Sequence, residues 1–316
     1  MIRLFSLCFY LLFLIACSND NEPVVNESPP VPSTQGHKEI FLVSGVTGQQ
    51  GGAVAKALLN EGYKVRGLSR NPKSDRALKM TSLGVEIVKG DFSDANSLDD
   101  ALKGTEGVFL ITNFWEHGYD AEVEQGKNMV DAAVRANISH LVFTSVANAN
   151  SATGIPHFDS KYEIEEYIRS KNIDFTILRP VSFMDNWAYS REEIVAGKLT
   201  SPFSMATRLQ QIAVRDIGRF AALAFQRPDE WKGRALDIAG EEYSVKQLVN
   251  IFSIMTGSPV EYIQIPWDEY EQSEGEEMTV MDRWIEGVGY SANINLVRSE
   301  LSDMWTLEDY LNESGW

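Results

Sequence analysis

Two side chains in the stretch "HFDSK" have the types and the spacing of a proton-transfer pair. Lys161 follows the aromatic ring of His157 by four residues. An imidazole, with an ordinary pKa of about 6.5, can act as a general acid or base. Ser145, at the end of a predicted strand, could hold a substrate oxygen. These three residues are the candidate catalytic groups.

The stretch "SGVTGQQGG" has the pattern of a phosphate-binding turn between a strand and a helix. Gly45, Gly48 and Gly51 follow a predicted buried strand, and a helix is predicted directly after them. The first glycine permits a tight turn, the second lets the backbone approach a pyrophosphate, and the third lets helix and strand pack closely. The N-terminus of the helix then receives the negative charge. This pattern predicts a dinucleotide site.

The end of the second predicted strand favours one dinucleotide over the other. A site for NAD(H) places Asp or Glu there to bind the ribose hydroxyls. This strand ends in "GLSRNP", and Arg70 can pair with a 2′-phosphate, so NADP(H) is preferred over NAD(H). The alternative for Arg70 is an ordinary solvated charge. Asp91 and Phe92, in "KGDFSD" after the third strand, would lie beside the adenine; the alternative is a role in starting the next helix.

A regular alternation of strands and helices positions these residues. A helical segment follows each of the first five predicted strands, which with the sixth cover 39–45, 63–71, 85–91, 107–113, 140–146 and 175–180. This alternation predicts an α/β, Rossmann-type, doubly wound parallel sheet. We expect a Rossmann core over about residues 38–185 and a smaller C-terminal substrate or partner lobe mainly from residues 186–316.

Composition narrows the classes of function. The net charge of -17 argues against a nucleic-acid binder, because phosphate binding needs a basic surface. The two cysteines, Cys8 and Cys17, both precede the predicted fold, so we expect no disulfide framework and no cysteine nucleophile within it. The histidines do not have the spacing of a metal site, and we expect no metal.

The first 37 residues have the pattern of an export signal followed by a tether. One arginine precedes an apolar run over residues 4–16, which is too short to span a bilayer comfortably. The run ends in "LIAC", which resembles the lipobox of bacterial lipoproteins, so we expect a signal peptide over residues 1–17 and lipidation of Cys17. Residues 18–37 are rich in Pro, Ser, Asn and Glu and are predicted to be a disordered tether.

This leader predicts a location in the cell envelope, with the lipid anchor as the only contact with the membrane and the outer membrane favoured. An uncleaved N-terminal anchor is the alternative. A cytoplasmic location follows if the start of the chain is misassigned, and it would agree better with the use of NADPH.

Six motifs, in order, resemble the NmrA-like group of atypical short-chain dehydrogenases/reductases. They are "VTGQQGG", "SRNP", "GDFSD", "TNFWE", "HFDSKYEIEEYIR" and "LRPVSFMDNW", and the resemblance runs from about residue 38 to the C-terminus. It implies that a nicotinamide dinucleotide contacts Gly45, Thr47, Gly48, Gln49, Gln50, Gly51, Arg70, Thr112, Asn113, Lys161, Pro180, Val181 and Phe183. Phe114, Trp115 and Glu116 either line the pocket or pack against the lobe.

The same resemblance leaves the chemistry open. The wider superfamily uses Ser, Tyr and Lys, and His157 stands at the position of the tyrosine. The NmrA-like group includes regulators that sense the NADPH/NADP ratio, and it is related to NADPH-dependent quinone reductases. We expect an NADP(H)-binding redox sensor or regulator with weak or no catalysis, in which Lys161 only holds the ribose and a protein partner reads the state of the site. The alternative is an NADPH-dependent reductase of quinones or similar small carbonyl compounds.

Overall fold

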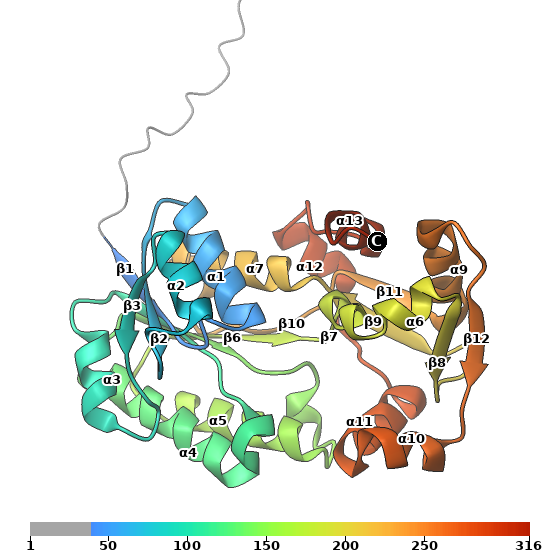
Figure 1. The fold of residues 1–316 in the computed structure, drawn as a ribbon. Coiled ribbons are helices and arrows are strands. Elements are labelled where there is room, and N and C mark those ends of the chain that lie inside the picture. The colour runs from blue at the N-terminus through green and yellow to red at the C-terminus, as the bar shows by residue number, and fades with distance from the viewer. Residues whose placement is uncertain (1–38) are drawn as a thin grey trace, which may run out of the picture. The chain divides into compact units, whose positions relative to one another are not determined.

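A seven-stranded parallel sheet forms the centre of the computed structural model, which describes residues 39–316 (Figure 1). The strand order is β10-β6-β5-β4-β1-β2-β3. The strands are β1 (Ile40–Val43), β2 (Lys64–Ser69), β3 (Glu86–Lys89), β4 (Gly107–Leu110), β5 (His140–Thr144), β6 (Phe175–Pro180) and β10 (Ala235–Ile238). The chain runs outward from β1 to β3 and then from β4 to β6 on the other side, which confirms the doubly wound fold. The predicted signal peptide with Cys17 and the tether over 18–37 lie outside the described residues.

Helices cover both faces of this sheet (Figure 1). One face carries α1 (Gln49–Asn60), α2 (Asp75–Ser82) and α7 (Val214–Gln226), and the other carries α3 (Ala95–Leu102), α4 (Phe114–Arg135) and α5 (Pro156–Arg169). Each face has its own hydrophobic core: Val54, Leu58 and Phe220 are fully buried on the first, and Leu98, Met129 and Ile164 on the second. Burial on both faces explains why the central strands β1, β4 and β5 are almost continuous apolar runs.

The segment expected in the smaller lobe also returns to the main sheet. β10 pairs with β6 as the seventh strand, α7 packs along α1, and the short helix α8 (Pro228–Trp231) leads into β10. Sequence patterns identify a strand but not its partner, so "GRALDIAG" could not be assigned to this edge in advance. Residues 186–316 therefore contribute to both parts of the fold.

Most of the remaining C-terminal elements form the lobe around a separate core. A three-stranded sheet has the order β11-β9-β7, and β8 pairs with β12. The strands are β7 (Ser182–Phe183), β8 (Lys198–Ser201), β9 (Arg208–Ile212), β11 (Glu241–Ser244) and β12 (Glu261–Gln264). The lobe helices are α6 (Arg191–Val195), α9 (Val245–Thr256), α10 (Trp267–Glu274), α11 (Glu276–Gly287) and α13 (Leu307–Glu313), whereas α12 (Ile294–Glu300) packs through the fully buried Val297 on the core that α1 and α7 share with the main sheet. Phe252, Leu248 and Leu311 are fully buried in the core of the lobe.

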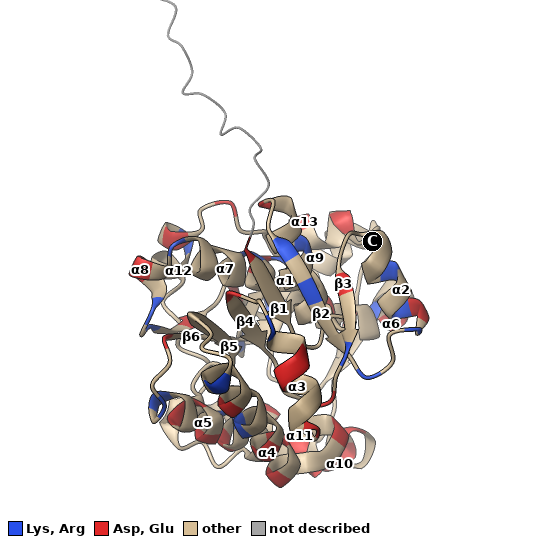
Figure 2. Cartoon of the chain, turned by 90° about the vertical axis from the view of Figure 1, so that its left-hand side faces the viewer, with Lys and Arg blue, Asp and Glu red and all other residues tan. Residues whose placement is uncertain are grey.

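Acidic residues recur along several helices (Figure 2), and no described helix has the character of a membrane span. Figure 2 shows Asp and Glu recurring along α3, α4, α10 and α11. Within residues 39–316, no helix combines the length and the apolar character that a membrane crossing requires.

Two helices bring site residues into their first turns. α4 opens with a turn over residues 114–117, where the side chain of Asn113 accepts a hydrogen bond from the backbone N–H of Trp115, and the non-helical backbone of Gly118 (φ 79, ψ -171) separates this turn from the long helix that follows. α5 begins at Pro156, a residue favoured in the first turn of a helix, so His157 lies inside the helix.

Candidate functional site

The residues predicted to bind or react follow the ends of six neighbouring strands. Because these strands are parallel, their carboxyl ends meet at one edge of the sheet, where ligands of such folds bind. The first predicted residues after β1 to β6 are Gly45, Arg70, Asp91, Thr112, Ser145 and Val181. The fold therefore brings the predicted groups together at this edge.

The turn after β1 requires glycine at two positions. Gly45 has φ +58, and a Cβ atom there would lie 2.6 Å from Cγ2 of Ile111. At Gly51 a Cβ atom would lie 2.3 Å from the backbone oxygen of Gly45, which cannot move aside as a side chain can. These contacts show why glycine is needed for the tight turn and for close packing of α1 against it.

The N-terminus of α1 has backbone donors to offer an anion. Its first residue follows Gly48, no side chain caps the helix, and no acidic residue lies in its first turn. The first N–H groups of a helix lack intrahelical partners and attract negative charge. Thr47, Gln49 and Gln50 flank this end, and Gln50 is held by a hydrogen bond from the hydroxyl of Thr144 to its Oε1 (2.7 Å).

Arg70 is paired with a carboxylate from the start of α4. Its Nη1 lies 2.5 Å from Oε1 of Glu116, and His117 lies on the same carboxylate at 3.7 Å. Both members of the pair are partly exposed, with 60% and 36% of their side-chain surfaces accessible. The hydrogen bond from Arg70 holds the pKa of Glu116 below its usual range. Glu116 therefore belongs to the candidate site because it is ion-paired with Arg70.

Asp91 and Phe92 form the turn that leads into α3. Asp91 accepts hydrogen bonds from the backbone and the hydroxyl of Ser93, which lower its pKa, and it is Asp94 that caps the helix. The backbone oxygen of Phe92 accepts a hydrogen bond from Asn128 (3.0 Å), and its ring packs against the core of that face. The capping role considered for Asp91 is therefore filled by another residue.

Lys161 is held by a fully buried carboxylate that the sequence did not reveal. Its Nζ lies 2.5 Å from Oε1 of Glu122 on α4, and 3.5 Å from the hydroxyl of Thr112. Glu122 also accepts hydrogen bonds from Thr112 (2.7 Å) and from Ser160 (2.5 Å), and its side chain is 0% exposed. An ammonium has three donors, so Lys161 keeps at least one for a ligand.

His157 is also held by a carboxylate, this time from the lobe. Its Nδ1 lies 2.5 Å from Oε1 of Glu277 on α11, which also accepts the backbone N–H of His157 at 3.2 Å. The imidazole lies among the rings of Phe114, Trp115 and Phe158, with centroids 5.7, 5.1 and 4.9 Å away. Burial lowers the pKa of His157, although Glu277 acts in the opposite direction.

The ends of β5 and β6 complete this part of the site. Ser145 is 4% exposed, and its Oγ has no hydrogen-bond partner within residues 39–316. Pro180 and Val181 are buried, and Val181 donates its N–H to Ile238 of β10, which fixes the start of the lobe beside the sheet. Phe183 follows on β7 and is partly buried. An unpaired buried hydroxyl is costly, and it is a candidate donor to a ligand.

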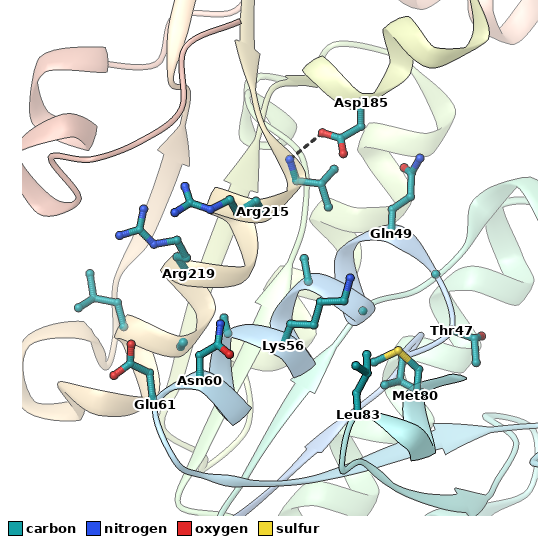
Figure 3. A pocket seen from close by; sticks show the side chains of 18 of the residues that line it. Thr47, Gln49, Lys56, Asn60, Glu61, Met80, Leu83, Asp185, Arg215 and Arg219 are labelled. Carbon is teal, nitrogen blue, oxygen red and sulfur yellow. Dashed lines mark hydrogen bonds between the residues drawn. The ribbon is translucent and has the colours of Figure 1, made fainter. Parts of the chain in front are cut away.

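A cavity of about 820 Å³ lies elsewhere, over α1 and between α2 and α7 (Figure 3). It touches the stretch of the glycine turn at Val46, Thr47, Gly48, Gln49 and Gly52, and neither Arg70 nor Lys161 lines it. The arginines of α7 that line it are already engaged, Arg215 over the ring of Trp305 and Arg219 with Asp303. Because this cavity lies outside the glycine turn and lacks Arg70 and Lys161, we take the carboxyl edge of the sheet as the candidate site.

Glu122 and Glu277 lie in acidic, polar stretches that look like solvated helix faces. Their spacing to Lys161 and His157 in the sequence carries no signal, because α4 and α11 reach those side chains only through the tertiary fold. The one available hint was Lys161 itself, because an ammonium that lies away from water needs a counter-charge.

Comparisons with known proteins agree with this architecture. The NmrA-like family model matches residues 37–311. An NmrA-like family domain-containing protein of Dictyostelium discoideum is 27% identical over 294 residues, which are 86% of this chain and 96% of that protein.

Two solved structures share the fold at lower identity. An NADPH-dependent quinone oxidoreductase of Escherichia coli, solved with NADPH, has a TM-score of 0.76 and 19% identity over 87% of this chain and 99% of its own. NmrA, a negative transcriptional regulator solved with NADP, has a TM-score of 0.72 and 21% identity over 88% of this chain and 95% of its own. NmrA has also been solved with NAD. The family match covers most of the sequence, and the chain therefore belongs to the NmrA-like family.

Proposed function

We propose that this chain is an NADP(H)-binding redox sensor or regulator with weak or no catalysis. The residues at the sheet edge fit such a dinucleotide: the uncapped end of α1 suits the pyrophosphate, and Arg70 suits the 2′-phosphate. A free donor of Lys161 and the unpaired hydroxyl of Ser145 suit the ribose and nicotinamide side. When bound, the nicotinamide supplies or accepts a hydride.

One observation favours sensing over turnover: both members of the proton-transfer pair are engaged by carboxylates of the chain itself. Glu122 neutralises Lys161, which weakens the influence of that ammonium on any neighbouring acid. Glu277 occupies Nδ1 of His157. His157 and Lys161 therefore bind carboxylates of the protein, which limits their contact with a substrate.

The tautomer of His157 supports the same conclusion. Burial keeps the imidazole neutral near pH 7, and a neutral ring bonded to Glu277 carries its proton on Nδ1. Nε2 is then an acceptor. Reduction of a carbonyl needs a proton donor at the substrate oxygen, so this arrangement is poorly suited to that chemistry.

The bond between His157 and Glu277 also suggests how cofactor state could reach a partner. It joins α5, beside the nicotinamide position, to α11 of the lobe. A ligand that moves His157 would move this contact, and the surface of the lobe is where a protein partner would read the change.

The alternative is an NADPH-dependent reductase of quinones or similar small carbonyl compounds. The unpaired hydroxyl of Ser145 and the aromatic rings around His157 favour it, since they suit an oxygen and a flat substrate. A hydroquinone anion can take its proton from water, so this reaction does not require an acid from the protein.

Binding and turnover separate the two proposals. NADPH should bind the full chain, and the fluorescence of NADPH should change in intensity or wavelength until the binding is saturated. Its oxidation with a panel of quinones should stay at the rate seen without protein. Sustained NADPH oxidation with any quinone, abolished by Ser145→Ala, would replace the sensor with the reductase.

A further inference from the structure

Arg70 is already engaged by a carboxylate of its own chain. Its Nη1 lies 2.5 Å from Oε1 of Glu116, and the charge of Asp91 acts on the same guanidinium. Taking the proposed function as the premise, we propose that Glu116 competes with the 2′-phosphate of NADP(H) for Arg70. Glu116 would then be a specificity-determining residue that reduces the preference of the site for NADP(H) over NAD(H).

The competition follows from the chemistry of the two acceptors. A guanidinium presents its donors as a planar fork that suits a carboxylate and a phosphate alike. The ion pair between Arg70 and Glu116 is partly exposed at both ends, and exposed pairs contribute little to stability. A phosphate monoester carries a charge of about -1.5 to -2 at pH 7, more than the single charge of a carboxylate. The phosphate can therefore displace Glu116 from Arg70.

Displacement still leaves negative charge beside the phosphate. Glu116 is ionised at neutral pH even without the hydrogen bond from Arg70, because the ordinary pKa of a glutamate is about 4.3. Asp91 is ionised as well, because hydrogen bonds from Ser93 lower its pKa. NAD(H) has only hydroxyls at this position and does not need the guanidinium, so its binding should not depend on the charge of Glu116.

The backbone allows Glu116 to move without loss of the rest of α4. Glu116 lies in the first turn of this helix, and Gly118 separates that turn from the remainder with φ 79 and ψ -171. This φ belongs to the left-handed side of the map, which glycine adopts without strain. The turn is thus a short unit that can shift about Gly118 while the buried residues of α4 stay in place.

A matched pair of variants tests this proposal in the full chain. Glu116→Gln removes the competing charge and keeps the size of the side chain. Glu124→Gln makes the same change on the same helix, at an exposed residue with no ion pair within the described part of the chain. The dissociation constants for NADPH and NADH are measured for both variants and for the unchanged chain.

Glu116→Gln should lower the dissociation constant for NADPH about three- to ten-fold and leave that for NADH within about two-fold. Glu124→Gln should change neither. Adenosine 2′,5′-bisphosphate should bind Glu116→Gln more tightly than the unchanged chain, and adenosine 5′-monophosphate should bind both equally, since only the first ligand carries the 2′-phosphate.

Three results would overturn the proposal in distinguishable ways. If Glu116→Gln binds NADPH as Glu124→Gln does, this inference fails and the proposed function stands. If Glu116→Gln instead binds NADH more weakly, Glu116 is an acceptor for ribose hydroxyls and not a competitor. If the unchanged chain binds neither dinucleotide, the proposed function fails and this inference with it.

Discussion

The two ends of the candidate site handle charge in opposite ways. At the end that we propose for the adenosine, the carboxylate of Glu116 is partly exposed, lies in a short turn beside Gly118, and pairs with an exposed Arg70. At the end that we propose for the nicotinamide, Glu122 is fully buried and holds Lys161 together with two hydroxyls. The first pair can exchange its partner for a ligand, whereas the second is part of the packed structure.

Because of this difference, we expect one end of the site to bind an anion and the other end to be poorly suited to proton transfer. An exposed pair costs little to open, so Arg70 remains available to an anion. Opening a buried pair leaves an unpaired charge in the protein interior, which is costly, so Lys161 stays paired with Glu122. The contrast between the two ends is the reason to expect a protein that binds a dinucleotide well and transfers protons poorly.

The largest expected effect is a loss of stability when the buried carboxylate of Glu122 is removed. Glu122→Gln should lower the free energy of unfolding by about 3 kcal/mol, near the low end for a broken buried pair because Lys161 keeps some exposure. Urea denaturation measures this change. The control is Glu163→Gln, which breaks a half-exposed pair with Lys127 and should cost under about 1 kcal/mol.

Equal destabilisation by these two variants would remove the contrast between the ends of the site. A second arm tests the cause: adding Lys161→Met to Glu122→Gln should restore part of the lost stability, since the unpaired charge is then gone.

A smaller effect is expected on the pKa of His157. Burial lowers its pKa while Glu277 opposes this, so Glu277→Gln should move the pKa further down. NMR titration of the imidazole measures this pKa, with Glu276→Gln, an exposed neighbour of Glu277, as the control.

The sign of the accompanying stability change also follows. A histidine whose pKa is lowered in the folded state is protonated preferentially in the unfolded chain. Its contribution to stability is therefore complete above about pH 6.5 and is lost as the pH falls below that value. Glu277→Gln should steepen this loss. A pKa of His157 that rises in Glu277→Gln would contradict the assigned role of Glu277.

The smallest effect on stability should come from the exposed end. Glu116→Gln should change the free energy of unfolding by less than about 0.5 kcal/mol, since one partly exposed ion pair is lost. Urea denaturation at low and moderate salt measures this. A loss comparable to that of Glu122→Gln would mean that Glu116 is structural and not free to leave Arg70.

The sheet and its glycine turn could be predicted because their signals are local. Apolar runs alternating with helical periodicity predicted six parallel strands, and the spacing of Gly45 and Gly51 predicted a turn that has no room for side chains there. The seventh strand and the carboxylates Glu122 and Glu277 could not be predicted. Their partners are set by packing between distant segments, and an acidic residue in a polar helix has the same local pattern whether it is solvated or buried.

The central claim is that Arg70 binds the 2′-phosphate of a dinucleotide held at the sheet edge. Titration of the full chain with NADPH and NADH tests it most directly, with Arg70→Glu compared with Arg76→Glu, an exposed arginine on α2 with no ion pair within residues 39–316. Arg70→Glu should weaken NADPH binding by about 10- to 100-fold and change NADH binding little. Arg76→Glu should leave the preference for NADPH intact. A preference for NADPH that survives Arg70→Glu would contradict the account.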